Sequence, residues 1–266
     1  MTGQNPRSNR KRNLVLAVTT VLVVLALWQA ASSVTPVNSR LVPTPLQVGK
    51  AVASMGQDGR LAKDSFASIT RAFAGFALGS ITAIICGLLT GRSELIRSSL
   101  GQIINLLRPV PAISIVPLVI VWFGLGETSK VFTVFWGVFF PVWINTHVGV
   151  GSVSIEHIWA ARSLGARRRT VLFEVVLPGA ATSILAGMRA GISLAFICLV
   201  AAEMAGASSG LGFRVTISHL TFRVDEMIAA IVVLGLLGAL ADKLFLVAAH
   251  KLFPWYSRSQ RGYQGD

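Results

Sequence analysis

Long apolar runs separated by short charged segments restrict most strongly what this chain can fold into. Six such runs can be read, over 14–34, 66–90, 99–122, 130–150, 180–203 and 227–249. Each is long enough to cross a bilayer as a helix, which takes roughly 20 mainly apolar residues. Only 13% of the residues are charged, about half the share of a water-soluble domain. The alternating segments of a transmembrane barrel are not found, so we expect an all-α membrane protein with six transmembrane helices.

The first run allows two interpretations. It follows the basic residues Arg7, Arg10, Lys11 and Arg12 and ends in small residues over 30–33, which is also the pattern of a cleaved signal peptide. The length of the run and the presence of Met1 favour a retained span, and we count it as one.

Basic residues predict the orientation in the membrane, because Lys and Arg favour the cytoplasmic side. With six spans, 13 basic residues fall on the side of the two termini and seven on the other. We therefore expect a cytoplasmic tail over 1–13, a membrane domain over 14–250 with a cytoplasmic loop over 151–179, and a cytoplasmic tail over 251–266. The outer segment 35–64 is expected to form a turn and a short helix that Gly49, Gly56 and Gly59 weaken.

Charge and cysteine content exclude other classes. The net charge of +13 is explained by membrane orientation, so we expect no nucleic-acid partner. Cys86 and Cys198 lie in apolar runs and are expected to pack as small apolar side chains. We expect no metal site and no catalytic constellation. The phosphate-binding motif G-x-x-x-x-G-K-[ST] is also missing, so any ATP must be bound by another subunit.

The loop over 151–179 holds the most informative pattern. Ile155, Ile158 and Trp159 have the spacing of one face of a short helix. Gly165 permits a sharp turn, and a second amphipathic piece with Val171, Leu172, Val175 and Val176 follows before Pro178. We expect nothing within the chain to bury this apolar stripe. It is then either a docking surface for a soluble partner or a helix lying on the bilayer, where Arg167–Arg169 would face lipid headgroups.

The spacing of this loop resembles the EAA loop of ATP-binding-cassette (ABC) importer permeases. The resemblance rests on Ala160, Ala161, Gly165, Leu177 and Pro178. Trp159 stands where that family has Glu, and Glu156, one turn earlier, is the candidate substitute.

Further segments resemble the nitrate/sulfonate/taurine subfamily. They are Arg108–Pro111, Pro117–Leu118, Trp122–Gly124, Glu127–Lys130, Ile144–Thr146, Ala202–Glu203 and Gly210–Gly212. The resemblance implies the type I importer (MetI-like) permease fold in the inner membrane of a bacterium. It also implies a second copy of the chain, two ATP-binding subunits that bind ATP and Mg, and a periplasmic or lipid-anchored substrate-binding protein.

The implied function is import of a small anion by alternating access, driven by ATP hydrolysis on the partner. The expected substrate is an aliphatic sulfonate or taurine, and the next candidates are nitrate, bicarbonate or an aromatic anion. An ion-gradient-driven secondary transporter is the alternative, and it would predict an inverted repeat, which the sequence does not show.

Polar residues inside the runs are the candidates for the translocation path, because they are costly in lipid. They are Arg108, Asn145, Arg189 and Glu203. Pro109 and Pro111 should break or bend the third run beside Arg108, leaving either an anion-attracting half-helix or a packing kink. Arg189 either pairs with an internal acid or lines the path. Arg71 and Glu203 lie near run ends, where snorkelling to the interface explains them.

Overall fold

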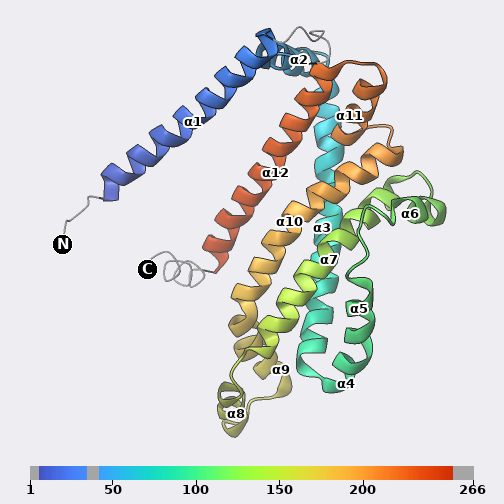
Figure 1. The fold of residues 1–266 in the computed structure, drawn as a ribbon. Helices are drawn as coiled ribbons and strands as arrows, with labels where there is room; N and C mark the ends of the chain where they lie inside the picture. Colours follow the sequence, from blue (N-terminus) through green and yellow to red (C-terminus); the bar gives the residue numbers. More distant parts are fainter. Residues whose placement is uncertain (1–5, 35–41, 254–266) are drawn as a thin grey trace. The chain divides into compact units, whose positions relative to one another are not determined.

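The computed structural model describes residues 6–34 and 42–253. The expected tails and outer segment fall partly outside these ranges, at 1–5, 35–41 and 254–266. In the described ranges the regular structure is helical (Figure 1). In chain order the elements are α1 (Pro6–Val34), α2 (Pro45–Gln57), α3 (Arg60–Arg92), α4 (Glu94–Ile96), the π-helical turn η1 (Arg97–Gly101), α5 (Gln102–Leu107), α6 (Val116–Phe123), α7 (Glu127–Gly151), α8 (Ile155–Ser163), α9 (Arg168–Thr170), the π-helical turn η2 (Val171–Val176), α10 (Leu177–Gly206), α11 (Leu211–Leu220) and α12 (Val224–Leu252).

Four described helices are long and apolar enough to cross a membrane. They are α3 (Arg60–Arg92), α7 (Glu127–Gly151), the continuous helical stretch of α9, η2 and α10 (Arg168–Gly206), and α12 (Val224–Leu252). Each extends beyond the run expected from the sequence. The first expected span lies in α1, whose apolar stretch, Val18–Ser32, is shorter. An all-helical membrane protein is therefore confirmed.

The expected span over 99–122 is not one continuous helix. α5 ends at Leu107, α6 begins at Val116, and the residues between them form turns. Pro109 and Pro111 lie in this interval and supply no backbone donor to continue a helix. Of the break or bend expected at these prolines, the structure shows a break, and it leaves two short helices in place of a span.

The described residues divide into two compact units, one from 6–34, 42–62 and 214–231, the other from 63–213 and 232–253. The core of the first unit holds Val48, Ala51 and Met55 of α2 together with Ala229. The expected short helix is present as α2, and its glycines do not prevent it. Thr44 caps α2 reciprocally with Gln47, which satisfies backbone groups that the helix start leaves open.

The core of the second unit is built on α3, α7 and α10, which run alongside one another (Figure 1). Gly75, Gly79, Gly87 and Gly91 of α3 all face α7. A Cβ atom at Gly75 would lie 2.5 Å from the Val134 Cβ, and one at Gly87 would lie 2.5 Å from the Thr146 Cβ. Backbones can approach this closely only where side chains are missing, as is common between membrane helices.

Glycines on both α7 and α10 also bring these two helices close together. Gly149 of α7 lies against Ser183, and Gly187 of α10 lies against Asn145, where an added Cβ would be 2.6 Å from that residue's own Cβ. Pro141 sits inside α7, and the Asn145 side chain donates a hydrogen bond of 2.8 Å to its carbonyl. These contacts make α3, α7 and α10 one closely packed group.

Replacing Gly87 by valine is expected to destabilise the chain, because the new side chain would overlap Thr146 of α7. Overpacking of this kind costs about 1–3 kcal/mol of unfolding free energy. The matched control is Gly49→Val in α2, since an added Cβ there meets nothing within 4 Å. Thermal unfolding of the purified variants in detergent should give a lower melting temperature for Gly87→Val, and equal melting temperatures would contradict the packing described.

Candidate functional site

Helix α8 begins and ends with specific caps. The Ser154 hydroxyl accepts a hydrogen bond from the Glu156 amide at 3.3 Å and donates one to the Glu156 carboxylate. This donated bond holds the pKa of the Glu156 carboxyl below its usual value. At the other end Gly165 adopts a φ of 82°, and the amides of Gly165 and Ala166 close the helix on the carbonyls of Arg162 and Ala161. Glycine suits this left-handed position, so the predicted turn at Gly165 is confirmed.

The apolar stripe of α8 is divided between core and surface. Ile158 is 1% exposed and packs with Val150, Val171 and Val176. The expectation that nothing in the chain would bury this stripe is therefore wrong for Ile158, although Ile155 and Trp159 stay exposed. Spacing alone does not show that η2 folds back against α8. Packing by Ile158 and Val176 holds α8 against the ends of α7 and α10.

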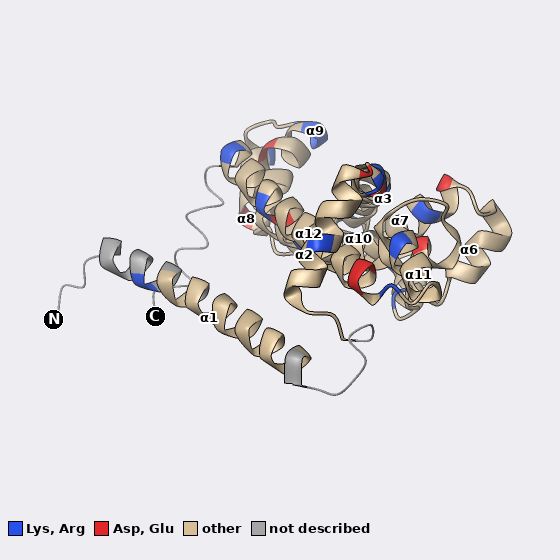
Figure 2. Cartoon of the chain, turned by 90° about the horizontal axis from the view of Figure 1, so that it is seen from above, with Lys and Arg blue, Asp and Glu red and all other residues tan. Residues whose placement is uncertain are grey.

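A smaller apolar surface of the loop stays uncovered. We call it the loop surface; it comprises Ile155, Trp159, Ala160, Leu164 and Phe173. Trp159 is 60% exposed and Leu164 is 89% exposed. The remaining residues of the loop pattern lie in the same segment: Glu156, Gly165 and Pro178 are exposed, and Ala161 and Leu177 are half-buried. Basic residues, among them Arg168 and Arg169 of α9, are exposed nearby in the chain (Figure 2).

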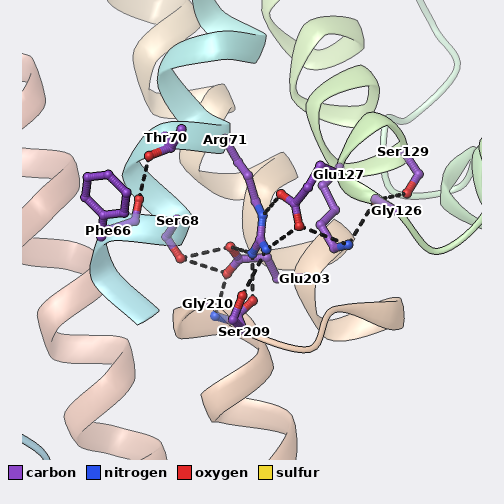
Figure 3. Close-up of polar contacts among 12 residues, drawn as sticks. Phe66, Ser68, Thr70, Arg71, Gly126, Glu127, Ser129, Glu203, Ser209 and Gly210 are labelled. Carbon is purple, nitrogen blue, oxygen red and sulfur yellow. Dashed lines mark hydrogen bonds and ion pairs between the residues drawn. The ribbon is translucent and has the colours of Figure 1, made fainter. Parts of the chain in front are cut away.

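A polar centre lies around Arg71 of α3, at the ends of α7 and α10 that are far from the loop surface (Figure 3). The three guanidinium nitrogens of Arg71, which is 4% exposed, make five hydrogen bonds. Nε and Nη2 bond both carboxylate oxygens of Glu127 at 2.5 and 2.7 Å. Nη1 bonds Glu203 at 2.8 Å and the carbonyl of Ser209 at 2.6 Å, and Nη2 bonds the Ser209 hydroxyl at 3.1 Å.

Glu203 is the buried counter-charge of this centre. Its carboxylate accepts hydrogen bonds from the Ser68 hydroxyl at 2.9 Å and from the Gly212 amide at 2.8 Å, besides that of Arg71. The Gly210 amide donates to Asp64 at 3.0 Å, and Gly210 itself has a φ of 117°. Side chains of α3 and α10 thereby organise the turn that leads into α11. The expectation that Arg71 and Glu203 snorkel to the interface is wrong, since both are buried and paired.

Three segments that the sequence resemblance singled out meet at this centre: Glu127–Lys130, Ala202–Glu203 and Gly210–Gly212. Lys130 completes it by donating to the carbonyls of Leu125 and Gly126, at 2.8 and 2.9 Å. Arg71, Ser68 and Ser209 were not predicted to take part. Their signal in the sequence is indirect: an ionisable residue within a span, such as Glu203, commonly pairs with another polar group.

The other candidate path residues have separate settings. Arg108 is exposed at the end of α5, beside the break. Arg189 of α10 pairs with Asp242 of α12 through bonds of 2.9 and 3.1 Å, and both side chains are partly exposed. Asn145 lies between α7 and α10 with its amide on the Pro141 carbonyl.

An apolar pocket of about 430 Å³ lies between α3, α10 and α12. Its walls include Ile69, Phe73, Phe196 and Leu240, and every residue that lines it is apolar. Because an anion needs positive or hydrogen-bond-donating partners, this pocket does not suit one.

Comparison with known proteins gives a consistent result. Residues 75–255 match the family model described as the binding-protein-dependent transport system inner membrane component. The taurine transport system permease protein of Escherichia coli (strain K12) is 34% identical, with 94% of this chain and 92% of that protein covered. A putative aliphatic sulfonates transport permease protein of Bacillus subtilis (strain 168) is 32% identical over 91% and 87%. A nitrate import permease protein of Synechocystis sp. is 29% identical over 91% and 92%.

Solved structures agree on the fold. A chain of the MetNI methionine ABC transporter, determined in inward-facing conformations, superposes with a TM-score of 0.60 at 18% identity. The match covers 76% of this chain and 98% of that one. The family match and the relatives together show that the chain belongs to the binding-protein-dependent transport system inner membrane component family, as an ABC-importer permease of the nitrate/sulfonate/taurine group.

Proposed function

We propose that the chain forms, with a second copy of itself, the translocation path of an ATP-driven importer for taurine or an aliphatic sulfonate. Two ATP-binding subunits bind on the cytoplasmic side, and a substrate-binding protein delivers the anion from the other side of the bacterial inner membrane. Nitrate, bicarbonate or an aromatic anion is the alternative substrate. ATP closes the ATPase subunits, and differential contacts with them shift the permease between outward-open and inward-open states.

The loop surface is the observation that carries this proposal. α8 is anchored from beneath by Ile158, while Trp159, Ala160 and Leu164 stay uncovered. A helix presented this way offers a rigid apolar face on which another protein can bury area. The alternative is a helix on lipid headgroups, which the exposed arginines over 167–169 would suit. The family to which the chain belongs favours the ATPase.

Glu156 is a weak substitute for the glutamate that Trp159 replaces. Its carboxylate already accepts the Ser154 hydroxyl at the start of α8. We therefore assign the coupling contact to the apolar side chains around Trp159 and the small residues Ala160 and Ala161. Glu156 acts mainly as a cap of the helix.

Arg108 is the best placed of the four candidate path residues. It is exposed where α5 ends, and the half-helix α6 follows the break. Glu203, Arg189 and Asn145 each have a partner within the chain, so we assign them structural roles. An exposed guanidinium beside irregular backbone suits transient contact with a sulfonate.

Replacing Ala160 by arginine is expected to abolish co-purification of the ATP-binding subunit, because a long charged side chain would hold the partner away from α8. The chain itself should keep its melting temperature, since Ala160 is exposed. The control is Ala53→Arg, an exposed alanine of α2. The assay extracts the tagged chain in mild detergent, co-expressed with its neighbouring genes, and quantifies the bound subunit by mass spectrometry. Undiminished binding by Ala160→Arg would remove the loop surface from the interface.

Replacing Arg108 by alanine is expected to lower taurine or alkanesulfonate uptake at least tenfold, with normal abundance in the membrane. Arg92→Ala, which removes another exposed arginine, should leave uptake near the native value. Uptake of radiolabelled substrate by vesicles that contain the whole complex measures both variants. Unchanged uptake in Arg108→Ala would exclude Arg108 from the path.

A further inference from the structure

Arg71 holds two carboxylates whose surroundings differ sharply. The Glu203 side chain is 0% exposed, whereas the Glu127 side chain is 65% exposed. Both are within ion-pair distance of the same buried guanidinium, at 2.8 Å for Glu203 and 2.5 Å for Glu127. One half of the centre is therefore enclosed, and the other half is exposed.

The half with Glu203 is fixed in place. Ser68 of α3 bonds Glu203 and also accepts from the Leu211 amide at 2.9 Å, so α3, α10 and the start of α11 share one set of hydrogen bonds. Releasing Glu203 from Arg71 would leave a fully buried carboxylate without its counter-charge. Such separation is strongly unfavourable in a medium of low polarity.

The half with Glu127 is easier to release. Glu127 is the first residue of α7, and its exposed carboxylate can exchange the Arg71 hydrogen bonds for water. The nearby cation, Lys130, lies 3.8 Å from it. After release, Arg71 keeps Glu203 and Ser209, so its charge stays balanced.

The segment that precedes Glu127 contains the short helix α6, which packs against α7 and α10. α6 has irregular backbone on both sides, over 108–115 and 124–126, and Gly124 has a φ of 74°. Its inner face packs through Val116 and Val119, which are 4% and 0% exposed, while Leu118 and Trp122 are exposed. α6 is thus a short apolar helix with a turn at each end. The second turn leads directly into Glu127, which pairs with Arg71 of α3. We call this turn and the two helix ends that it joins the α6–α7 corner.

We propose that the Arg71–Glu127 pair is a releasable latch of the α6–α7 corner, with Arg71–Glu203 as its fixed anchor. The latch lies at the end of α7 and α10 opposite the loop surface, on the side that faces the substrate-binding protein. It opens when the corner moves during the transport cycle, and it closes again on the same guanidinium. The assignment to a transport cycle rests on the proposed function, whereas the latch itself is a property of this chain.

The test uses a thiol placed beneath the corner. Val119→Cys introduces a side chain of similar size at a fully buried position of α6, and a water-soluble methanethiosulfonate reagent modifies it only when the corner opens. Glu127→Gln keeps the volume of the side chain and removes its charge. We expect Val119→Cys to react at least tenfold faster when combined with Glu127→Gln, in the purified chain and in the assembled complex.

Two controls make the result specific. Glu94→Gln weakens another ion pair, Arg97–Glu94 at 3.3 Å, whose side chains are also exposed, and should not change the rate. The chain without Val119→Cys gives the background of Cys86 and Cys198. Glu203→Gln should lower the melting temperature more than Glu127→Gln, because it breaks the enclosed half.

Equal reaction rates with and without Glu127→Gln would overturn the latch. A loss of melting temperature in Glu127→Gln as large as in Glu203→Gln would also overturn it, since both pairs would then be structural. These readouts are taken on the chain itself, so they remain separate from a failure of the ATP-binding subunit to associate, which would overturn the proposed function.

Discussion

The burial of one guanidinium, that of Arg71, determines how one end of the second unit is built. A cation enclosed among apolar helices has to be matched by anions and hydrogen-bond acceptors, and the buried Glu203, the exposed Glu127 and Ser209 supply them. Removing the buried partner of such a cation, here Glu203, typically costs about 3–5 kcal/mol. The ends of α3, α7 and α10 and the turn before α11 therefore depend on one another, although they are far apart in the sequence.

The glycine contacts extend this order along the helices. Because α3, α7 and α10 touch through backbone and small side chains, they have little room to slide independently. α7 has 25 residues, so at 1.5 Å per residue it separates the Arg71 centre from α8 by about 37 Å. A displacement of α8 by a partner would reach the α6–α7 corner through these closely packed helices, which is the physical basis for relating the loop surface to the latch.

The sequence predicted the long helices, the break at Pro109 and Pro111, and the turn at Gly165, because each depends on local chemistry. Apolar run length, a missing backbone donor and a left-handed φ are all visible within a few residues. It did not predict which helices meet. The pairing of Arg71 with Glu203 spans 132 positions. The burial of Ile158 of α8 depends on η2 folding back against that helix. The motif segments around Glu127, Glu203 and Gly210 were found, but only the structure shows that they form one centre.

We propose that this permease transports only as part of an ATP-driven complex. The most direct measurement is uptake of radiolabelled taurine by liposomes that contain the purified chain, its ATP-binding subunit and its substrate-binding protein, with ATP inside or outside the vesicles. We expect uptake that requires both partners and ATP hydrolysis and that an unlabelled alkanesulfonate inhibits. Uptake by the chain alone, driven by an ion gradient without ATP, would contradict it.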